Sequence, residues 1–140
     1  MKIVMGLPPM AYETNTPKDG VVDRLQIVRY LPGIGSLAPH ADPYLHQRLF
    51  LSGYMSKRGV DYRGGGFYLV GPDHQKVEVE DRIDVGDVAI GYASLQHGVD
   101  PCDGEPSWER DDGRWFLSMY SNASDEVAER HTGHPVELAA

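Results

Sequence analysis

The sequence predicts an all-β domain, a sandwich or barrel of jelly-roll type with few or short helices. Short apolar runs recur along the chain, about eight in all, and turn-forming residues stand between them. The 140 residues include 16 Gly and 10 Pro, and 41% are apolar, which indicates a folded chain that turns often. No segment shows a convincing amphipathic-helix pattern, so strands and turns account for most of the predicted structure.

The first elements are predicted from short local patterns. Residues 2–5 form a candidate edge strand, and residues 24–30 alternate apolar and other side chains as a half-buried strand does. The turn "LPGIGS" then leads into "LAPHAD". Further strands are expected at residues 47–55, 67–70, 76–80, 87–93 and 114–120. Some helix is expected near residues 123–130, where Ser124 is a candidate N-cap and acidic residues fill the first turn.

The chain length fits one domain with one core. We expect an N-terminal extension over residues 1–24, a core over residues 25–122, and a tail over residues 123–140 that is partly helical or disordered. The acidic stretch "VEVEDRIDVGD" is expected to be a solvated strand face and turn. Three consecutive glycines at 64–66 precede no helix and no Lys-Ser/Thr pair, so close strand packing explains them better than a phosphate cradle.

Charge and composition exclude several classes of partner. The net charge is −8 and no basic cluster is visible, which makes nucleic acid an improbable partner. No apolar run approaches the ~18 residues of a membrane span, and no signal-peptide pattern opens the chain. We therefore expect a cytoplasmic protein without a membrane segment. Cys102 is the single cysteine, so an intrachain disulfide framework and a thiolate zinc site are both excluded.

A candidate metal site is formed by residues that lie far apart in the sequence. If "PHAD" is a strand, His40 and Asp42 point to the same side of it. His97 follows a Gly-Asp turn and an apolar strand, and antiparallel strands folded back on each other would bring it to His40. Two His and one carboxylate are the ligand set of non-haem Fe(II) sites. Arg114 opens a later strand, where its guanidinium could hold a carboxylate.

With these residues, the stretch from Leu25 to Tyr120 resembles the double-stranded β-helix core of the Fe(II)- and 2-oxoglutarate-dependent dioxygenases. The prolyl-4-hydroxylase-like branch is the most similar. The matches, in chain order, are Tyr30-x-x-Gly33 leading to His40-Ala41-Asp42, then Arg48 and the strand up to Gly65-Gly66-Phe67, then Gly86-Asp87-Val88 leading to His97-Gly98-Val99, and finally Arg114. The resemblance makes residues 25–122 a cupin-like catalytic core.

The resemblance implies a role for each matching position. His40, Asp42 and His97 would hold Fe(II), and Arg114 and Tyr30 would bind the distal carboxylate of the co-substrate 2-oxoglutarate. A further co-substrate contact falls on Tyr54 or Met55, and the sequence does not decide between them. The implied enzyme is a hydroxylase that uses dioxygen and releases succinate and carbon dioxide. An acidic residue at 42 also argues for hydroxylation or desaturation over halogenation.

Two departures from the family pattern lead to further expectations. The segment between His97 and Arg114 is long, and Arg110 would substitute if the last strand were displaced. Trp108, within that segment, is a candidate border of the substrate site. The short N-terminal extension would leave an apolar sheet face exposed, so a second subunit or a partner protein is expected to cover it.

The sequence leaves two rival functions and several substrates open. One rival is a cupin-type metal-dependent isomerase or binding module, whose second motif also leads from Gly-Asp to His. The other is a non-catalytic protein that keeps the fold. Candidate substrates are a free amino acid, another small molecule or a protein side chain.

Overall fold

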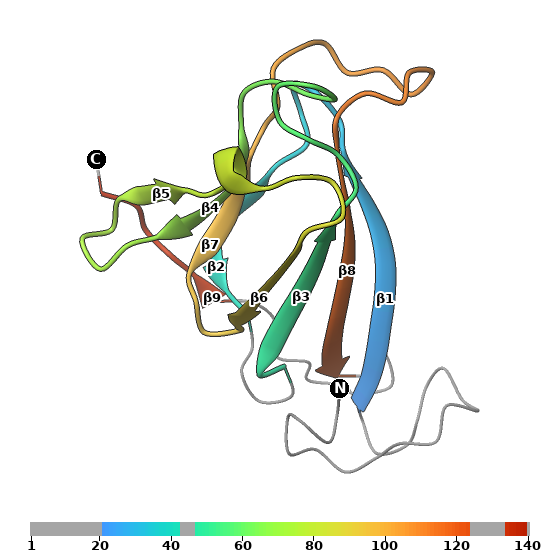
Figure 1. Ribbon diagram of the computed structural model, residues 1–140. Helices are drawn as coiled ribbons and strands as arrows, with labels where there is room; N and C mark the ends of the chain where they lie inside the picture. Colours follow the sequence, from blue (N-terminus) through green and yellow to red (C-terminus); the bar gives the residue numbers. More distant parts are fainter. Residues whose placement is uncertain (1–20, 43–46, 124–133, 140) are drawn as a thin grey trace.

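The computed structural model describes residues 21–42, 47–123 and 134–139, and these ranges fold almost entirely as β-structure (Figure 1). The strands are β1 (Val21–Tyr30), β2 (Leu37–Ala41), β3 (Leu49–Tyr54), β4 (Gly66–Val70), β5 (Lys76–Glu78), β6 (Val88–Tyr92), β7 (His97–Asp100), β8 (Arg114–Ala123) and β9 (His134–Pro135). A single 3-10 turn, η1 (Glu80–Arg82), is the one helical element in the described ranges. The all-β prediction is confirmed. The predicted strand at 2–5 and the predicted helix from Ser124 onward lie outside the described residues.

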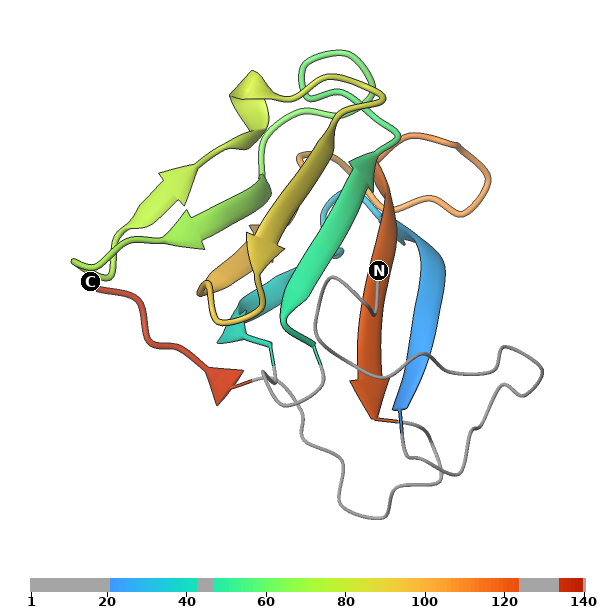
Figure 2. The ribbon, with the colours of Figure 1, turned by 60° about the horizontal axis from the view of Figure 1, so that its bottom comes forward.

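The strands form two sheets with the orders β1-β8-β3-β6 and β5-β4-β7-β2-β9 (Figure 2). The pairing follows one simple rule. β1 pairs with β8, β2 with β7, β3 with β6 and β4 with β5, always antiparallel. The first half of the chain is therefore paired with the second half in reverse order, as in one long hairpin that is folded into two layers. This pairing brings residues from distant parts of the sequence to neighbouring positions.

The strands form where the sequence alternates, and they end where glycine or a tight turn interrupts the alternation. In β6 the side chains are alternately exposed and half-buried, which is the period of a strand with one covered face. β5 ends at Glu78, short of the predicted boundary at residue 80, because Glu80 begins η1. β8 is longer than predicted and pairs with β1 over its whole length.

An apolar row crosses the β1-β8-β3-β6 sheet. Leu25 lies opposite Met119, Met119 opposite Leu51, and Leu51 opposite Ile90, so the row spans all four strands. Its two ends are well exposed, with Leu25 at 64% and Ile90 at 65%. Contiguous exposed apolar patches of more than about a few hundred Å² are uncommon on a monomer and mark contact surfaces. The sheet therefore carries the exposed apolar face that the sequence predicted.

The described part of the C-terminal tail contains a short strand, β9, which the sequence did not predict. β9 pairs with the end of β2, opposite His40 and Ala41, and the Val136 N–H donates to the carbonyl of Pro39. The tail thus extends the second sheet beside the candidate metal site. No helix within the described ranges has the length and hydropathy needed to cross a bilayer.

Candidate metal centre

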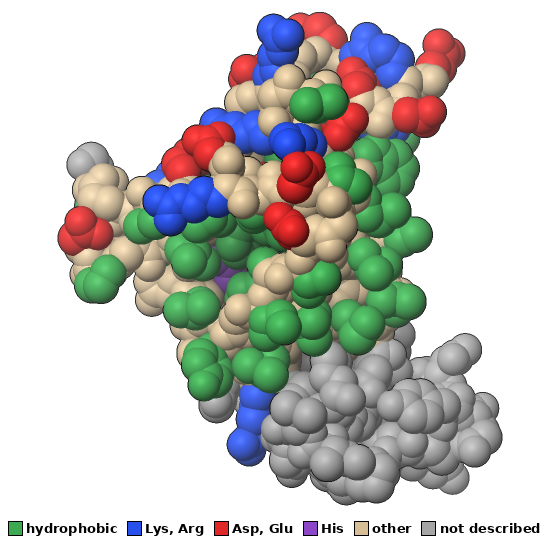
Figure 3. Space-filling view, in the orientation of Figure 1, with side chains coloured by type: hydrophobic (Ala, Val, Ile, Leu, Met, Phe, Trp, Pro, Cys, Tyr) green, Lys and Arg blue, Asp and Glu red, His purple; other side chains and the backbone are tan. Residues whose placement is uncertain are grey.

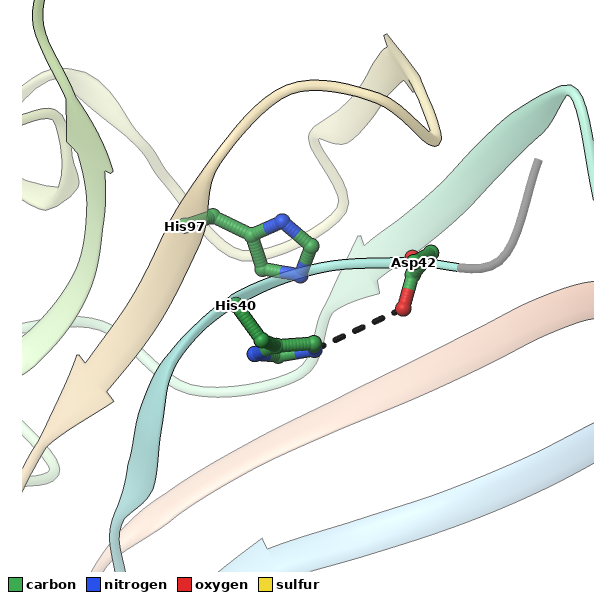
Figure 4. A group of neighbouring side chains, drawn as sticks. All are labelled: His40, Asp42 and His97. Atoms are coloured by element: carbon green, nitrogen blue, oxygen red, sulfur yellow. Dashed lines mark ion pairs between the residues drawn. The ribbon is translucent and has the colours of Figure 1, made fainter. Parts of the chain in front are cut away.

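The side chains of His40, Asp42 and His97 converge on one place between the sheets (Figure 4). His40 lies near the end of β2, Asp42 follows that strand, and His97 begins β7. His40 and His97 are direct partners in the β2–β7 register, and their ring centroids are 4.5 Å apart. Each residue offers a ligand atom within 4.8 Å of the other two. The structure therefore brings together the three residues that the sequence predicted as metal ligands.

The backbone fixes both imidazoles in the same way. His40 Nδ1 lies 2.8 Å from the carbonyl oxygen of Ala38, and His97 Nδ1 lies 2.8 Å from that of Leu95. A carbonyl can only accept, so in both neutral rings Nδ1 carries the proton and Nε2 keeps its lone pair. His40 Nε2 points toward Asp42, 3.4 Å from Oδ1. A second nitrogen held by a carbonyl is the usual support of a metal-binding histidine.

Asp42 is held on both its backbone and its side chain. Its N–H donates to the carbonyl of Ala93 in the turn after β6, which links the residue beyond the end of β2 to the first sheet. Gln47 Nε2 donates to Asp42 Oδ2 at 2.7 Å, and Gln47 itself is buried. With Oδ2 occupied, Oδ1 is the oxygen that faces His40. Sequence reasoning missed Gln47, because a lone Gln before a strand carries no recognisable signal.

Two aromatic side chains pack beside His97. The rings of Phe50 and Phe67 each lie 5.4 Å from the ring of His97. In the space-filling view, His atoms are visible in a hollow bordered by hydrophobic side chains (Figure 3). Burial lowers the pKa of His97, while the hydrogen bond with Asp42 raises the pKa of His40. His97 is therefore neutral, and a proton or a metal ion is attracted to the side of His40 that faces Asp42.

Arg114 begins β8 and is almost fully buried, 2% exposed. Its guanidinium carbon lies 5.6 Å from the ring centroid of Tyr30, 5.3 Å from that of Tyr54 and 4.8 Å from that of Phe116. The long loop before β8 does not displace it. Arg110 stays in that loop and pairs with Asp112, so it does not take the position of Arg114 at the start of β8.

The loop between β7 and β8 is held by an arginine of β1. Arg29 donates to the carbonyl oxygens of Ser107, Arg110 and Asp112. Trp108 in this loop is 84% exposed. Because the loop leaves the end of β7 opposite to His97, Trp108 does not border the metal cluster.

Glu80 is the buried partner of Arg114. Its Oε1 accepts from Arg114 Nη2 at 2.6 Å, from Arg114 Nε at 2.7 Å and from the Phe67 N–H at 3.0 Å. Its Oε2 accepts from the hydroxyl of Tyr62. The prediction of a solvated acidic face is wrong at this position, because the chain leaves β5 at Glu78 and η1 turns Glu80 inward. Gly66 makes room for it, since a Cβ there would lie 2.9 Å from Glu80 Cγ.

One nitrogen of Arg114 remains without a partner. Among the described residues, Arg114 Nη1 is buried and has no hydrogen-bond acceptor. Such a group is costly to bury, by roughly 1–3 kcal/mol, unless an acceptor reaches it. An unsatisfied guanidinium nitrogen is a suitable partner for one carboxylate oxygen.

Two tyrosines lie beside this arginine. Tyr30 is the cross-strand partner of Arg114 and stacks on Phe116, with ring centroids 5.8 Å apart. Tyr54 is 3% exposed, whereas Met55 is 47% exposed. Burial raises the pKa of Tyr30, and it raises the pKa of Tyr54 to about 12, so both hydroxyls stay protonated and can donate. The geometry thus places Tyr54, and not Met55, beside Arg114.

The two sets of side chains suit the two ligands that the sequence suggested, a metal ion and an organic carboxylate. Two imidazole Nε2 atoms and one carboxylate oxygen fit a divalent first-row metal, iron included. The unpaired Nη1 of Arg114, with two nearby phenols, fits one end of an organic carboxylate. Comparisons of the chain with family models, curated proteins and solved structures give no significant match.

Proposed function

We propose that this protein is an Fe(II)- and 2-oxoglutarate-dependent oxygenase of the prolyl-4-hydroxylase-like type, acting as a hydroxylase. The observation that carries the proposal is the convergence of His40, Asp42 and His97, with both Nδ1 atoms held by backbone carbonyls and His40 Nε2 facing the Asp42 carboxylate. A ligand set of this kind leaves open positions on the metal for a co-substrate and dioxygen.

The fold that we propose is a double-stranded β-helix, or jelly roll. What supports it is the reverse-order pairing of β1 with β8, β2 with β7, β3 with β6 and β4 with β5. Eight antiparallel strands in two layers are the usual content of this architecture. The distribution of the site over β2 and β7 follows from the same pairing.

Each residue of the site has a distinct task. His40, Asp42 and His97 hold the iron, and Gln47 fixes the orientation of the carboxylate. Arg114 Nη1 and the hydroxyls of Tyr30 and Tyr54 bind the distal carboxylate of 2-oxoglutarate. Iron, 2-oxoglutarate and dioxygen together supply the oxidising power to hydroxylate an unactivated C–H bond, with succinate and carbon dioxide as the other products. Phe50 and Phe67 shield the ring of His97 from water.

We further propose that the substrate is a small molecule or an amino-acid side chain. The net charge of −8 argues against nucleic acid, since phosphate groups would be repelled. A second subunit or a partner protein would cover the apolar row that runs from Leu25 to Ile90. Light scattering of the purified chain tests for the second subunit, and a strictly monomeric particle would argue against it.

The function is tested by anaerobic titration of the chain with Fe(II) and 2-oxoglutarate. We expect a weak visible charge-transfer band in the wild type and no band in His97→Ala. The control is His74→Ala, because His74 is exposed and is not one of the three clustered residues. A band that survives His97→Ala would remove His97 from the site.

A different result would favour a rival function. If the chain binds a divalent metal at the cluster but forms no band with 2-oxoglutarate, a cupin-type isomerase or binding module becomes the better interpretation. Where the band forms, a metabolite screen that measures succinate release identifies the substrate. Absence of succinate with every candidate would favour a non-catalytic protein that keeps the fold.

A further inference from the structure

Glu80 and Arg114 form a buried ion pair. Arg114 is 2% exposed and Glu80 is also 2% exposed. Glu80 accepts from two nitrogens on one edge of the guanidinium, and the Phe67 N–H and the Tyr62 hydroxyl donate to the same carboxylate. A carboxylate with this many donors stays in place, because breaking a buried pair leaves an uncompensated charge.

This pair changes what Arg114 can offer to a ligand. The positive charge of the guanidinium is already balanced by Glu80, and the edge formed by Nε and Nη2 is occupied. Nη1 is the part of the guanidinium that lacks a partner among the described residues. A ligand group that reaches Nη1 therefore meets a neutral ion pair and not an isolated cation. A second carboxylate there would also lie near that of Glu80, and like charges repel.

We propose that Glu80 makes the co-substrate anchor neutral, so that this site accepts 2-oxo acids whose distal end is any hydrogen-bond acceptor and prefers a carboxylate only weakly. The inference rests on the proposed function, since it concerns the same proposed co-substrate site. Glu80 is here a residue that sets specificity through Arg114. The hydroxyls of Tyr30 and Tyr54 can donate to a neutral oxygen as well as to a charged one.

The test compares three 2-oxo acids by their dissociation constants in the anaerobic Fe(II) titration. 2-Oxoglutarate has a charged distal acceptor, its 5-methyl ester has a neutral one, and 2-oxopentanoate has none. In the wild type we expect 2-oxoglutarate to bind less than about tenfold more tightly than the ester, and 2-oxopentanoate to bind more weakly than both. In Glu80→Gln we expect the preference for 2-oxoglutarate over the ester to increase by about tenfold, because the cation is then unbalanced.

The matched control is Tyr62→Phe, which removes a hydrogen bond to Glu80 and leaves its charge. It should keep the wild-type preference. An unchanged preference in Glu80→Gln would overturn the inference. If Glu80→Gln does not fold, the measurement on the wild type tests the inference alone. A wild-type preference of more than about tenfold for 2-oxoglutarate over the ester would then count against a neutral anchor. Absence of a band with all three acids would instead refute the proposed function, so the two failures are distinguishable.

Discussion

Gln47 donates a hydrogen bond of 2.7 Å from its side-chain nitrogen to Oδ2 of Asp42 and thereby fixes which carboxylate oxygen faces His40. The bond joins a buried amide to a candidate metal ligand. Partners of this kind orient a ligand and commonly change metal affinity without touching the ion. We predict that Gln47→Met, which keeps the length of the side chain and removes the donor, weakens Fe(II) binding by about 10- to 100-fold.

The measurement for Gln47→Met is an anaerobic metal titration, with circular dichroism to check the fold. Gln26→Met is the control, because Gln26 is exposed and accepts a hydrogen bond only from Tyr120 among the contacts described for its side chain. Metal affinity in the control should equal that of the wild type. Equal affinity in Gln47→Met and the wild type would show that Asp42 does not need this support.

The pH dependence of metal binding should follow His40. Its pKa is raised above the ordinary 6.5, first by the hydrogen bond to Asp42, whereas burial lowers the pKa of His97. A proton on His40 excludes the metal from Nε2, so affinity falls as the pH falls through the raised pKa of His40. We predict that the pH dependence of metal binding has its midpoint above pH 6.5. A single proton should compete with the metal, because His97 stays neutral in that pH range. Metal titrations across this pH range test it, and a midpoint below 6.5 would contradict it.

Much of the fold could be predicted because strand patterns are local. The run at 24–30 alternates with a period of two, the run at 87–93 is a short apolar run between turn signals, and the structure has strands β1 and β6 there. The same period placed His40 and Asp42 on one side of the chain. That prediction holds although β2 ends at Ala41, since His40 Nε2 and Asp42 Oδ1 lie 3.4 Å apart.

The parts of the site that could not be predicted depend on distant contacts. The alternation in "VEVE" assigns Glu78 and Glu80 to the same strand face, and nothing local shows that the strand stops between them. Glu80 becomes buried because Arg114, Tyr62 and the Phe67 N–H surround its carboxylate. The choice between Tyr54 and Met55 likewise needs the register of β3 against β8, which a single sequence does not fix.

Tyr54 should contribute to co-substrate binding and Met55 should not. Tyr54 is buried with its ring 5.3 Å from the guanidinium carbon of Arg114, whereas Met55 is exposed. Tyr54→Phe removes only the hydroxyl, and loss of one hydrogen bond of about 0.5–1.5 kcal/mol predicts roughly 2- to 12-fold weaker binding of 2-oxoglutarate. Met55→Leu is the matched control and should bind like the wild type. The charge-transfer titration measures both, and equal weakening in the two variants would show a general effect on β3.

Replacing Gly65 by alanine is predicted to destabilise the fold, because the added Cβ would meet the backbone of Pro101. Gly65 has a φ of +50°, and a Cβ there would overlap the carbonyl group of Pro101. Gly59 has a φ of +84° with nothing near its Cβ position. Both Gly→Ala changes therefore cost about 1–2 kcal/mol of left-handed strain, but Gly65→Ala adds a clash that only movement of the backbone relieves. Urea denaturation should show a larger loss for Gly65→Ala, and equal losses would mean that the 101–103 segment yields easily.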